Sequence, residues 1–373
     1  MLDVMVLEVY TSVPMKKETT SRMCMRVRKV AVLGASGLVA QRFQQRLANH
    51  PWFELVAVYG SPRTAGKNLA DLEWHLPEVR PDIPPLQIRS MDSLMNDVED
   101  FEVVFSALPS EIAITVEKPL AEKGLFVFSN ASTHRMDNDV PLIVADLNPH
   151  HLLTLNNGDS AKGFVACSTN CTIVPAALPL KPLWDFIGLD GVSIATEQSL
   201  SGGGIDLLTN YRDTNEHSSD IPGEAEKMKE ECLSLLGRAR VGGVKSAKLP
   251  VQVTVRRVNR EYGHVVNVIA DLHVEKNEEE VREWMENYRS RPQALDLPSA
   301  PETPFVFVDD LIPSSMADPA TDLKAGMAVR IGEFDVDGDM VTFRAWSENT
   351  IRGAAGGTVL LAELALAEGL LGE

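Results

Sequence analysis

The sequence predicts an α/β fold: a Rossmann-type doubly wound parallel sheet joined to an α+β domain with a mostly antiparallel sheet. Between residues 29 and 148, short apolar runs alternate with helical segments, which is the order typical of a parallel sheet. A glycine-rich turn follows the first apolar run and opens a helix. After residue 190 the runs alternate in polarity, as antiparallel strands do.

The composition indicates a globular chain with an acidic surface. Its 373 residues suffice for two domains, and 44% of them are hydrophobic, which allows a sizeable core. The formal net charge of −18 argues against a nucleic acid or an anionic membrane as partner. No apolar run reaches the roughly 18 residues that a membrane-spanning helix needs. Any anion site must therefore be built locally from a few basic residues.

The glycine-rich turn predicts dinucleotide binding. Residues 29–34 form a Val-rich run typical of a buried parallel strand, and a helix then extends to about residue 49. Glycines in such a turn let a phosphate approach free N–H groups at the start of the helix. The predicted cofactor contacts are Gly34, Ser36, Gly37, Leu38 and Val39. The alternative is an ordinary turn between a strand and a helix.

The end of the second predicted strand, residues 53–59, favours NADP over NAD. NAD-selective sites place a carboxylate there to bind the ribose hydroxyls. This chain instead has Ser61, Arg63, Thr64 and Lys67. We expect Ser61 and Arg63 to contact the 2′-phosphate of NADP. The alternative is a polar surface loop.

A basic residue follows the strand predicted at residues 125–130. Open α/β sheets bind ligands just past the carboxyl ends of their strands. Arg135 is therefore a candidate for binding an anion. The alternative is a surface ion pair with Asp137 or Asp139.

The candidate nucleophile is Cys171. It follows Asn170, precedes Thr172, and lies where a loop leads into an apolar helix that begins near residue 173. The free N–H groups and partial positive charge of a helix N-terminus lower the pKa of a thiol. The alternative is that Cys171 is a small buried apolar residue, the role we expect for Cys167.

The four cysteines also limit the compartment and the metal content. Cys24, Cys167, Cys171 and Cys232 lack the spacing of a disulfide framework, which indicates a reducing compartment. No nearby Cys/His pair completes a zinc set with Cys167 and Cys171, so no metal is expected.

The second half of the chain predicts further loops around this thiol. A strand at residues 191–198 ends in a glycine-rich loop, and a helix over residues 221–238 carries Lys227. Further strands are predicted at 251–258, 264–272, 305–309, 328–334 and 340–346, and a helix at 278–288. Gly353–Gly357 opens a last helix that we expect to return toward the cofactor.

Several separated motifs together resemble the aspartate-semialdehyde dehydrogenase family, especially its archaeal and fungal-type branch. The resemblance covers residues 30–366, and the motifs follow in the family's order, which makes the match specific. They are the turn at 34–39, the segment 129–137, Asn170-Cys171-Thr172, Gln198 ahead of 201–204, Glu224 with Lys227, Arg257 with Gly263-His264, and Asn349 ahead of 352–356.

The resemblance implies a reversible, NADPH-dependent reductive dephosphorylation. L-aspartyl 4-phosphate gives L-aspartate 4-semialdehyde and inorganic phosphate, a step toward lysine, threonine and methionine. Cys171 would form a thioester. His264 would act as general acid and base, and Gln198 would orient the acyl group.

The resemblance also implies which residues bind the anionic groups of the substrate and the cofactor. They are Arg257 for the substrate carboxylate; Arg135, Lys227 and Asn170 for the phosphate; Glu224 for ordering the substrate and Lys227; and Ser201, Gly202 and Asn349 for the cofactor.

One segment departs from the family pattern. Residues 258–262 replace a short apolar stretch and bring Asn259 and Arg260 next to Arg257, which leaves the accepted acyl group open. Arg257 and His264 are seven positions apart, so on one straight strand they would face opposite sides of the sheet. We therefore expect residues 261–263 to form a bend or bulge.

Two alternative functions stay open. A related enzyme could keep the acyl chemistry and accept malonyl-CoA or an N-acyl-glutamyl phosphate. The other alternative is a non-catalytic NADP-binding protein, against which the intact set of Cys171, Gln198, Arg257 and His264 argues.

The expected organisation has an extension and two domains. Residues 1–28 are expected to be a disordered or dispensable extension, although a start at Met25 or an organelle-targeting role stays open. Residues 29–165 with 347–373 would form the NADP-binding domain, and residues 166–346 the catalytic and dimerisation domain. We expect a cytoplasmic homodimer or homotetramer that pairs through the antiparallel sheet.

Overall fold

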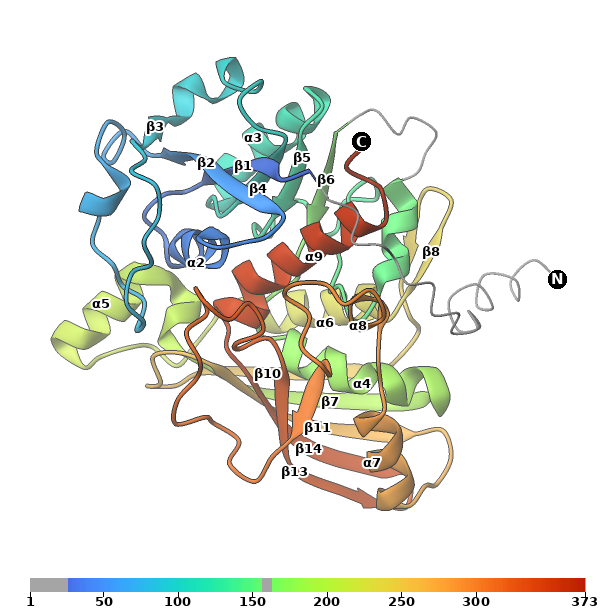
Figure 1. Cartoon of the computed structure of the whole chain (residues 1–373). Coiled ribbons are helices and arrows are strands. Elements are labelled where there is room, and N and C mark those ends of the chain that lie inside the picture. Colours follow the sequence, from blue (N-terminus) through green and yellow to red (C-terminus); the bar gives the residue numbers. More distant parts are fainter. Residues whose placement is uncertain (1–25, 156–162, 373) are drawn as a thin grey trace.

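The computed structural model describes residues 26–155 and 163–372, so most of the predicted extension at residues 1–28 lies outside the described residues. Within them, the chain forms two six-stranded sheets and a small hairpin of β8 (Arg238–Arg240) and β9 (Gly243–Lys245). Figure 1 shows the first sheet in the upper half of the molecule and the second in the lower half.

The first sheet is parallel throughout, in the order β3-β2-β1-β4-β5-β6. Its strands are β1 (Arg28–Leu33), β2 (Phe53–Gly60), β3 (Arg89–Ser90), β4 (Val103–Ser106), β5 (Phe126–Ser129) and β6 (Phe164–Cys167). Val30 and Val32 pack on one face with the helices α2 (Leu38–Leu47) and α9 (Gly356–Ala367). Ala31 and Leu33 pack on the other face with α3 (Ser110–Glu122). Helices on both faces explain the continuous apolar strands and confirm the predicted doubly wound sheet.

The second sheet is mixed, in the order β10-β7-β11-β14-β13-β12. Its strands are β7 (Leu189–Gln198), β10 (Val251–Arg257), β11 (His264–Leu272), β12 (Phe305–Phe307), β13 (Val329–Asp337) and β14 (Met340–Ser347). The three inner pairings are antiparallel, whereas the edge strands β10 and β12 run parallel to their neighbours. The helices α4 (Val174–Phe186) and α7 (Glu278–Glu286) pack on one face. The other face exposes residues such as Ala195 and Ile269.

The remaining elements lie between the strands along the chain. They are α5 (Gly204–Thr214), α6 (Glu224–Leu235), α8 (Arg291–Ala294), the 3-10 helices η1 (Leu69–Asp71), η2 (Met91–Asn96), η3 (Pro149–Leu155) and η4 (Leu200–Gly203), and the π-helical turn η5 (Ile351–Ala355). Figure 1 shows α4, α6 and α9 between the two sheets.

Residues 261–263 form the bend that we expected between Arg257 and His264. The sheet order adds that the two strands that carry these residues are not neighbours, because β7 lies between them. Arg257 ends β10, and it is in register with Gln198 at the end of β7. His264 begins β11, where it pairs with Ser347 at the end of β14. Four strand ends therefore meet at the same end of the mixed sheet. The alternation of side chains between the two faces of a single strand does not decide where Arg257 and His264 lie.

Candidate active site

The thiol of Cys171 and the imidazole of His264 form the centre of the site. Cys171 lies in a turn between the end of β6 at Cys167 and the start of α4 at Val174. His264 is the first residue of β11. The distance from Cys171 Sγ to His264 Nε2 is 3.2 Å, so the edges of the two sheets meet at this pair. This is hydrogen-bond reach between a nucleophile and an acid or base.

His264 is fully buried, and its other ring nitrogen is held by Ser199. The backbone N–H of Ser199 donates to Nδ1 over 3.0 Å, and the Ser199 hydroxyl lies 3.1 Å from the same atom. Since Nδ1 accepts an N–H, the proton of the neutral ring lies on Nε2 and faces the sulfur of Cys171. Burial, reinforced by the charges of Arg257 and Arg260, holds the pKa of His264 well below its usual value.

The thiol of Cys171 differs from our expectation of a lowered pKa. Burial, together with the carboxylate of Glu224, raises the pKa of Cys171 to about 11. The pKa is lowered by Arg135, the Thr172 hydroxyl and Arg257, but their effect is smaller than the rise. The start of α4 lies three residues beyond the thiol, and the helix dipole acts mainly within its first turn. The resting pair therefore consists of a neutral thiol and a neutral imidazole.

Gln198, Arg257 and Gly202 surround the pair on the side of the mixed sheet. Gln198 is buried and lies next to Ser199, and Arg257 donates from Nη1 to the Ser199 carbonyl over 2.8 Å. Gly202 in η4 packs directly on the site. A Cβ atom at Gly202 would lie 2.9 Å from His264 Cε1 and 3.0 Å from Arg257 Nη1. The position needs glycine because two site residues occupy that space.

Asn349, predicted as a cofactor contact, joins three loops of the site. Its side-chain oxygen accepts the backbone N–H of Gly263 over 2.8 Å and the Ser199 hydroxyl over 3.1 Å. Its amide nitrogen donates to the Ser201 hydroxyl over 3.0 Å. Asn349 and Ser201 are both buried. Both residues therefore fix the loops around the Ser199 hydroxyl, which in turn contacts His264.

Gly353 brings the last part of the chain against the nucleophile. It lies in the π-helical turn η5, and a Cβ atom there would be 2.7 Å from Cys171 Cβ. Within an α-helix, π-type turns are frequent at functional sites. The glycine-rich start of the last helix therefore packs on the thiol, a contact that the sequence analysis did not anticipate.

The helix α6 contacts the residue before the nucleophile. Glu224 accepts a hydrogen bond from Asn170 Nδ2 over 2.7 Å. Glu231, two turns further along α6, accepts the backbone N–H of Asn170 over 2.6 Å. Arg135 donates to Glu231 over 3.0 Å, so its partner is neither Asp137 nor Asp139. Lys227 is exposed on the same helix, three residues after Glu224.

The segment that departs from the family pattern packs on the loop after β7, and the guanidinium of Arg260 bonds to the backbone. Arg260 donates from Nε to the Gly263 carbonyl over 2.7 Å and from Nη2 to the Glu197 carbonyl over 3.0 Å. Gly263 has a φ of 80°, and a Cβ atom there would lie 2.2 Å from Trp346 Nε1. Arg260 therefore stabilises the loop between β10 and β11. The guanidinium N–H groups of Arg257 other than the one that binds the Ser199 carbonyl are left for a ligand.

The predicted cofactor turn has the features that a phosphate needs. Gly34 has a φ of 99°, and a Cβ atom there would lie 2.8 Å from the Ala107 carbonyl oxygen. The helix α2 begins after Gly37 without a side-chain cap and without an acidic residue in its first turn. The N–H groups of Ser36, Leu38 and Val39 therefore face no competing carboxylate.

The residues predicted for the 2′-phosphate follow β2. Ser61 and Arg63 are both exposed, and Arg63 makes no ion pair with any residue that the structure describes. The Ser61 carbonyl accepts the Thr64 hydroxyl, so a turn presents both side chains beyond the strand end. Gly34 and Ala35 pack against the end of the same strand, since both donate to the Tyr59 carbonyl.

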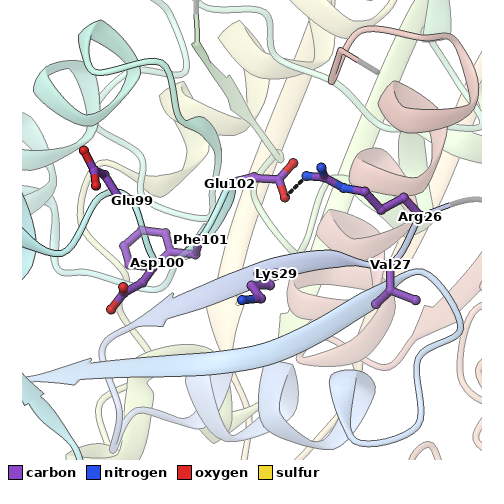
Figure 2. Close-up of a pocket in the computed structure, with 7 residues that line it drawn as sticks. All are labelled: Arg26, Val27, Lys29, Glu99, Asp100, Phe101 and Glu102. Atoms are coloured by element: carbon purple, nitrogen blue, oxygen red, sulfur yellow. Dashed lines mark hydrogen bonds and ion pairs between the residues drawn. The ribbon is translucent and has the colours of Figure 1, made fainter.

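A surface cavity of about 380 Å³ lies at the opposite edge of the parallel sheet. Figure 2 shows its lining residues at the amino ends of β1 and β4, where Arg26 pairs with Glu102. None of the predicted site residues lines it. Among residues 26–155 and 163–372, no cluster of His, Cys, Asp or Glu could hold a metal ion. No helix in these ranges is long and apolar enough to cross a membrane.

Sequence reasoning missed two residues of the site, Ser199 and Glu231. Ser199 lies between the two predicted residues Gln198 and Ser201, and its main interaction uses the backbone, which no side chain reveals. Glu231 had a detectable signal. It lies seven positions after Glu224, and this spacing places both carboxylates on one face of a helix.

Comparisons with known proteins identify the family. Residues 29–155 match the family model described as "Semialdehyde dehydrogenase, NAD binding domain". An aspartate-semialdehyde dehydrogenase of Methanothermobacter thermautotrophicus is 37% identical over 90% of this chain and 98% of its own length. A malonyl CoA reductase (NADP) of Metallosphaera sedula is 31% identical over 93% and 99%. The crystal structure of aspartate semialdehyde dehydrogenase with NADP from Candida albicans superposes with a TM-score of 0.79 at 30% identity, covering 92% of this chain and 99% of that one. The chain therefore belongs to the aspartate-semialdehyde dehydrogenase family.

Proposed function

We propose that this chain catalyses the reversible NADPH-dependent reductive dephosphorylation of L-aspartyl 4-phosphate to L-aspartate 4-semialdehyde. The observation that carries the proposal is the 3.2 Å approach of Cys171 Sγ to His264 Nε2, with Arg257 and Gln198 at the adjoining strand ends. Family membership supports this reading, since the relative with 37% identity is named for this activity. The product would supply the biosynthesis of lysine, threonine and methionine.

The thiol divides the reaction into two steps. After its proton has left to solvent, Cys171 Sγ bonds as thiolate to the acyl carbon, and the carbon–oxygen bond to phosphate breaks so that phosphate leaves with the electron pair. NADPH, when bound, supplies the hydride that reduces the thioester. His264 Nε2 gives a proton to the resulting oxygen and takes it back as the carbon–sulfur bond breaks, so that the aldehyde leaves and Sγ keeps the electron pair as thiolate. The neutral Nε2–H of His264 donates toward the sulfur in the free enzyme.

Positive charge beside the thiol suits a dianionic substrate. Arg257 uses one N–H of its guanidinium for the Ser199 carbonyl, and the others suit a bidentate pair with the substrate carboxylate. Lys227 and Asn170 are proposed to hold the phosphate, with Glu224 ordering Asn170 over 2.7 Å. Gln198 would orient the acyl oxygen. Arg135 contributes its charge to this region while paired with Glu231.

NADP is the proposed cofactor. The uncapped start of α2 would hold the pyrophosphate, with Gly34 and Gly37 allowing its close approach. Ser61 and Arg63 would contact the 2′-phosphate. The solved relative from Candida albicans was determined with NADP, which supports this choice.

The test is an assay of NADPH formation by the purified protein. With aspartate semialdehyde and NADP, we expect the rate to depend on inorganic phosphate, which attacks the thioester in the reverse direction. NAD should be the poorer cofactor. A rate that ignores phosphate would contradict the proposal, and NADPH formation from malonate semialdehyde with coenzyme A would favour the malonyl-CoA alternative. Arg260 gives that alternative no support, because its guanidinium binds backbone carbonyls.

We also propose that the protein is a cytoplasmic homodimer or homotetramer. The face of the mixed sheet opposite α4 exposes Ala195 and Ile269, an arrangement that suits a second copy. The free thiols of Cys167 and Cys232 suit a reducing compartment. Light scattering after gel filtration should give twice or four times the 40.9 kDa chain mass, and a monomer would contradict this assembly.

A further inference from the structure

One buried carboxylate, that of Glu231 on α6, accepts hydrogen bonds from the turn that carries Cys171. Only 3% of Glu231 is exposed. Its Oε2 accepts the backbone N–H of Asn170 over 2.6 Å and the Thr169 hydroxyl over 2.7 Å. Its Oε1 accepts from Arg135 Nη1 over 3.0 Å. Both oxygens of the carboxylate are therefore used, and two of the three donors belong to the residues just before the nucleophile.

The neighbouring contacts leave Asn170 little freedom. Its side-chain nitrogen donates to Glu224, which lies on the same face of α6 as Glu231. Its side-chain oxygen accepts the backbone N–H of Thr172 over 2.8 Å. Asn170 is thus fixed through its backbone and through both atoms of its amide. Cys171 lies between Asn170 and Thr172, so its position follows from theirs.

Regular secondary structure does not hold this turn. The strand β6 ends at Cys167 and α4 begins at Val174. Between them Ser168 donates to the Ser129 carbonyl and Ile173 to the Asn170 carbonyl, whereas the N–H groups of Asn170 and Thr172 donate to side chains. Charge-assisted hydrogen bonds to a carboxylate are stronger than neutral ones. Arg135 offsets the cost of burying the charge of Glu231.

We propose that Glu231 is a positioning residue for Cys171: it holds the Thr169–Asn170 backbone so that Sγ stays within reach of His264, and Arg135 is its counter-ion. The inference rests on the proposed role of Cys171 as nucleophile. A displacement of about 1 Å between reacting groups is enough to cost on the order of 100-fold in rate. Glu231 touches neither the thiol nor the imidazole, so it acts through the turn.

The first experiment compares Glu231→Gln with Glu230→Gln, an exposed neighbour on the same helix. Glutamine keeps one oxygen that can accept from the turn, but it loses the ion pair with Arg135. Its NH₂ group must also face a donor that the second carboxylate oxygen of Glu231 accepts from. We expect E231Q to lower kcat about 10- to 100-fold while KM for the semialdehyde changes less than about threefold. E230Q should match the wild type. Wild-type kcat in E231Q would overturn the proposal.

The second experiment separates positioning from stability and needs no substrate. Glu231→Met removes the acceptors of all three hydrogen bonds and leaves Arg135 buried without its ion-pair partner, so its Tm should fall. The double variant E231M/R135M removes both charges and should recover most of that Tm. Hydrogen exchange of residues 168–172 should nevertheless stay at least about tenfold faster than in the wild type, because the acceptor for the Asn170 N–H is gone.

The two experiments distinguish this inference from the proposed function. Wild-type exchange protection of the turn in folded E231M/R135M would show that Glu231 does not hold it, whatever the enzyme's substrate. A wild-type enzyme without phosphate-dependent activity, combined with fast exchange in the variant, would instead refute only the proposed function.

Discussion

The chemistry of single residues depends here on how burial sets their protonation. Burial raises the pKa of Cys171 and lowers the pKa of His264, so both groups are neutral in the free enzyme near neutral pH. Such a pair keeps the thiol from reacting until ligands enter. The positive nicotinamide of NADP⁺, when bound, would favour the thiolate, whereas the charge of Glu224 opposes it.

The alkylation rate of Cys171 in the free enzyme should report this protonation. A thiol with a pKa of about 11 reacts roughly tenfold faster for each unit of pH, because only the thiolate is nucleophilic. We expect the iodoacetamide rate at Cys171 to rise from pH 6 to pH 10 without a plateau. Mass spectrometry of each alkylated cysteine makes the measurement, with buried Cys232 as internal control. A plateau below pH 8 would show a thiolate–imidazolium pair instead.

Gly202 tests whether the space around His264 is as tight as the structure shows. An added methyl in Gly202→Ala would meet His264 Cε1 at 2.9 Å and Arg257 Nη1 at 3.0 Å, so both must shift. We expect kcat/KM for the semialdehyde to fall about 10- to 100-fold with a small change in Tm. The measurement is steady-state kinetics beside thermal melting. Unchanged kinetics would mean that the loop at Gly202 moves without disturbing the site.

Much of the residue-scale site could be predicted from the sequence, but its protonation could not. Cys171, His264, Gln198 and Arg257 each belong to a short motif. The raised pKa of the thiol depends on burial by segments as distant as Gly353, which no local motif reveals. Likewise the partner of Arg135 is Glu231, 96 positions away, although two acidic residues lie closer in sequence.

At the scale of elements, the loop between β10 and β11 decides where Arg257 and His264 lie. It crosses the end of β7, and the φ of 80° at Gly263 makes the turn into β11 possible. The hydrogen bond from Gly263 to Asn349 and the bond from Arg260 to the Gly263 carbonyl fix this turn. The loop therefore needs a specific backbone rather than a specific charge.

Two glycines with left-handed backbone form a matched test of this loop. A Cβ atom at Gly263 would lie 2.2 Å from Trp346 Nε1, whereas at Gly338, in the hairpin between β13 and β14, it would meet nothing within 4 Å. Gly338→Ala should cost about 1 kcal/mol of unfolding free energy, because only the backbone conformation is strained. Gly263→Ala should cost at least about 3 kcal/mol and most of the activity.

Denaturant unfolding with both variants makes this comparison. If G263A and G338A lost the same unfolding free energy, the crowding of a side chain at residue 263 against Trp346 would be contradicted. If G263A were as active as G338A, the turn at Gly263 would not set the positions of Arg257 and His264.

The bounds of the strands could be predicted from the sequence, but their order in the sheet could not. The strands at residues 251–257 and 264–272 were predicted close to their observed bounds, because alternating polarity is a local signal. Their separation by β7 was not predicted, since pairing in a sheet depends on contacts between distant segments. For the same reason the parallel edge strands of the mixed sheet were not anticipated.

At the scale of the whole molecule, an acidic protein gathers its positive charge where two sheets meet. The net charge is −18, yet Arg135 and Arg257 come from two distant segments and both act on the thiol of Cys171. The parallel sheet contributes the end of β6, and the mixed sheet contributes the ends of β7, β10 and β14 and the start of β11. The fold class was predictable because each half has its own periodicity, whereas the contact between the halves was inferred only through family resemblance.

The central claim is that Cys171 receives the acyl group, and covalent trapping tests it most directly. Wild-type enzyme mixed with L-aspartyl 4-phosphate, without NADPH, should gain the mass of one aspartyl group per chain upon acid quenching. Fragmentation of the peptide that carries Cys167 and Cys171 should place the adduct on Cys171, and Cys171→Ala should gain nothing. An adduct on Cys167, or turnover by C171A at the wild-type rate, would contradict the account.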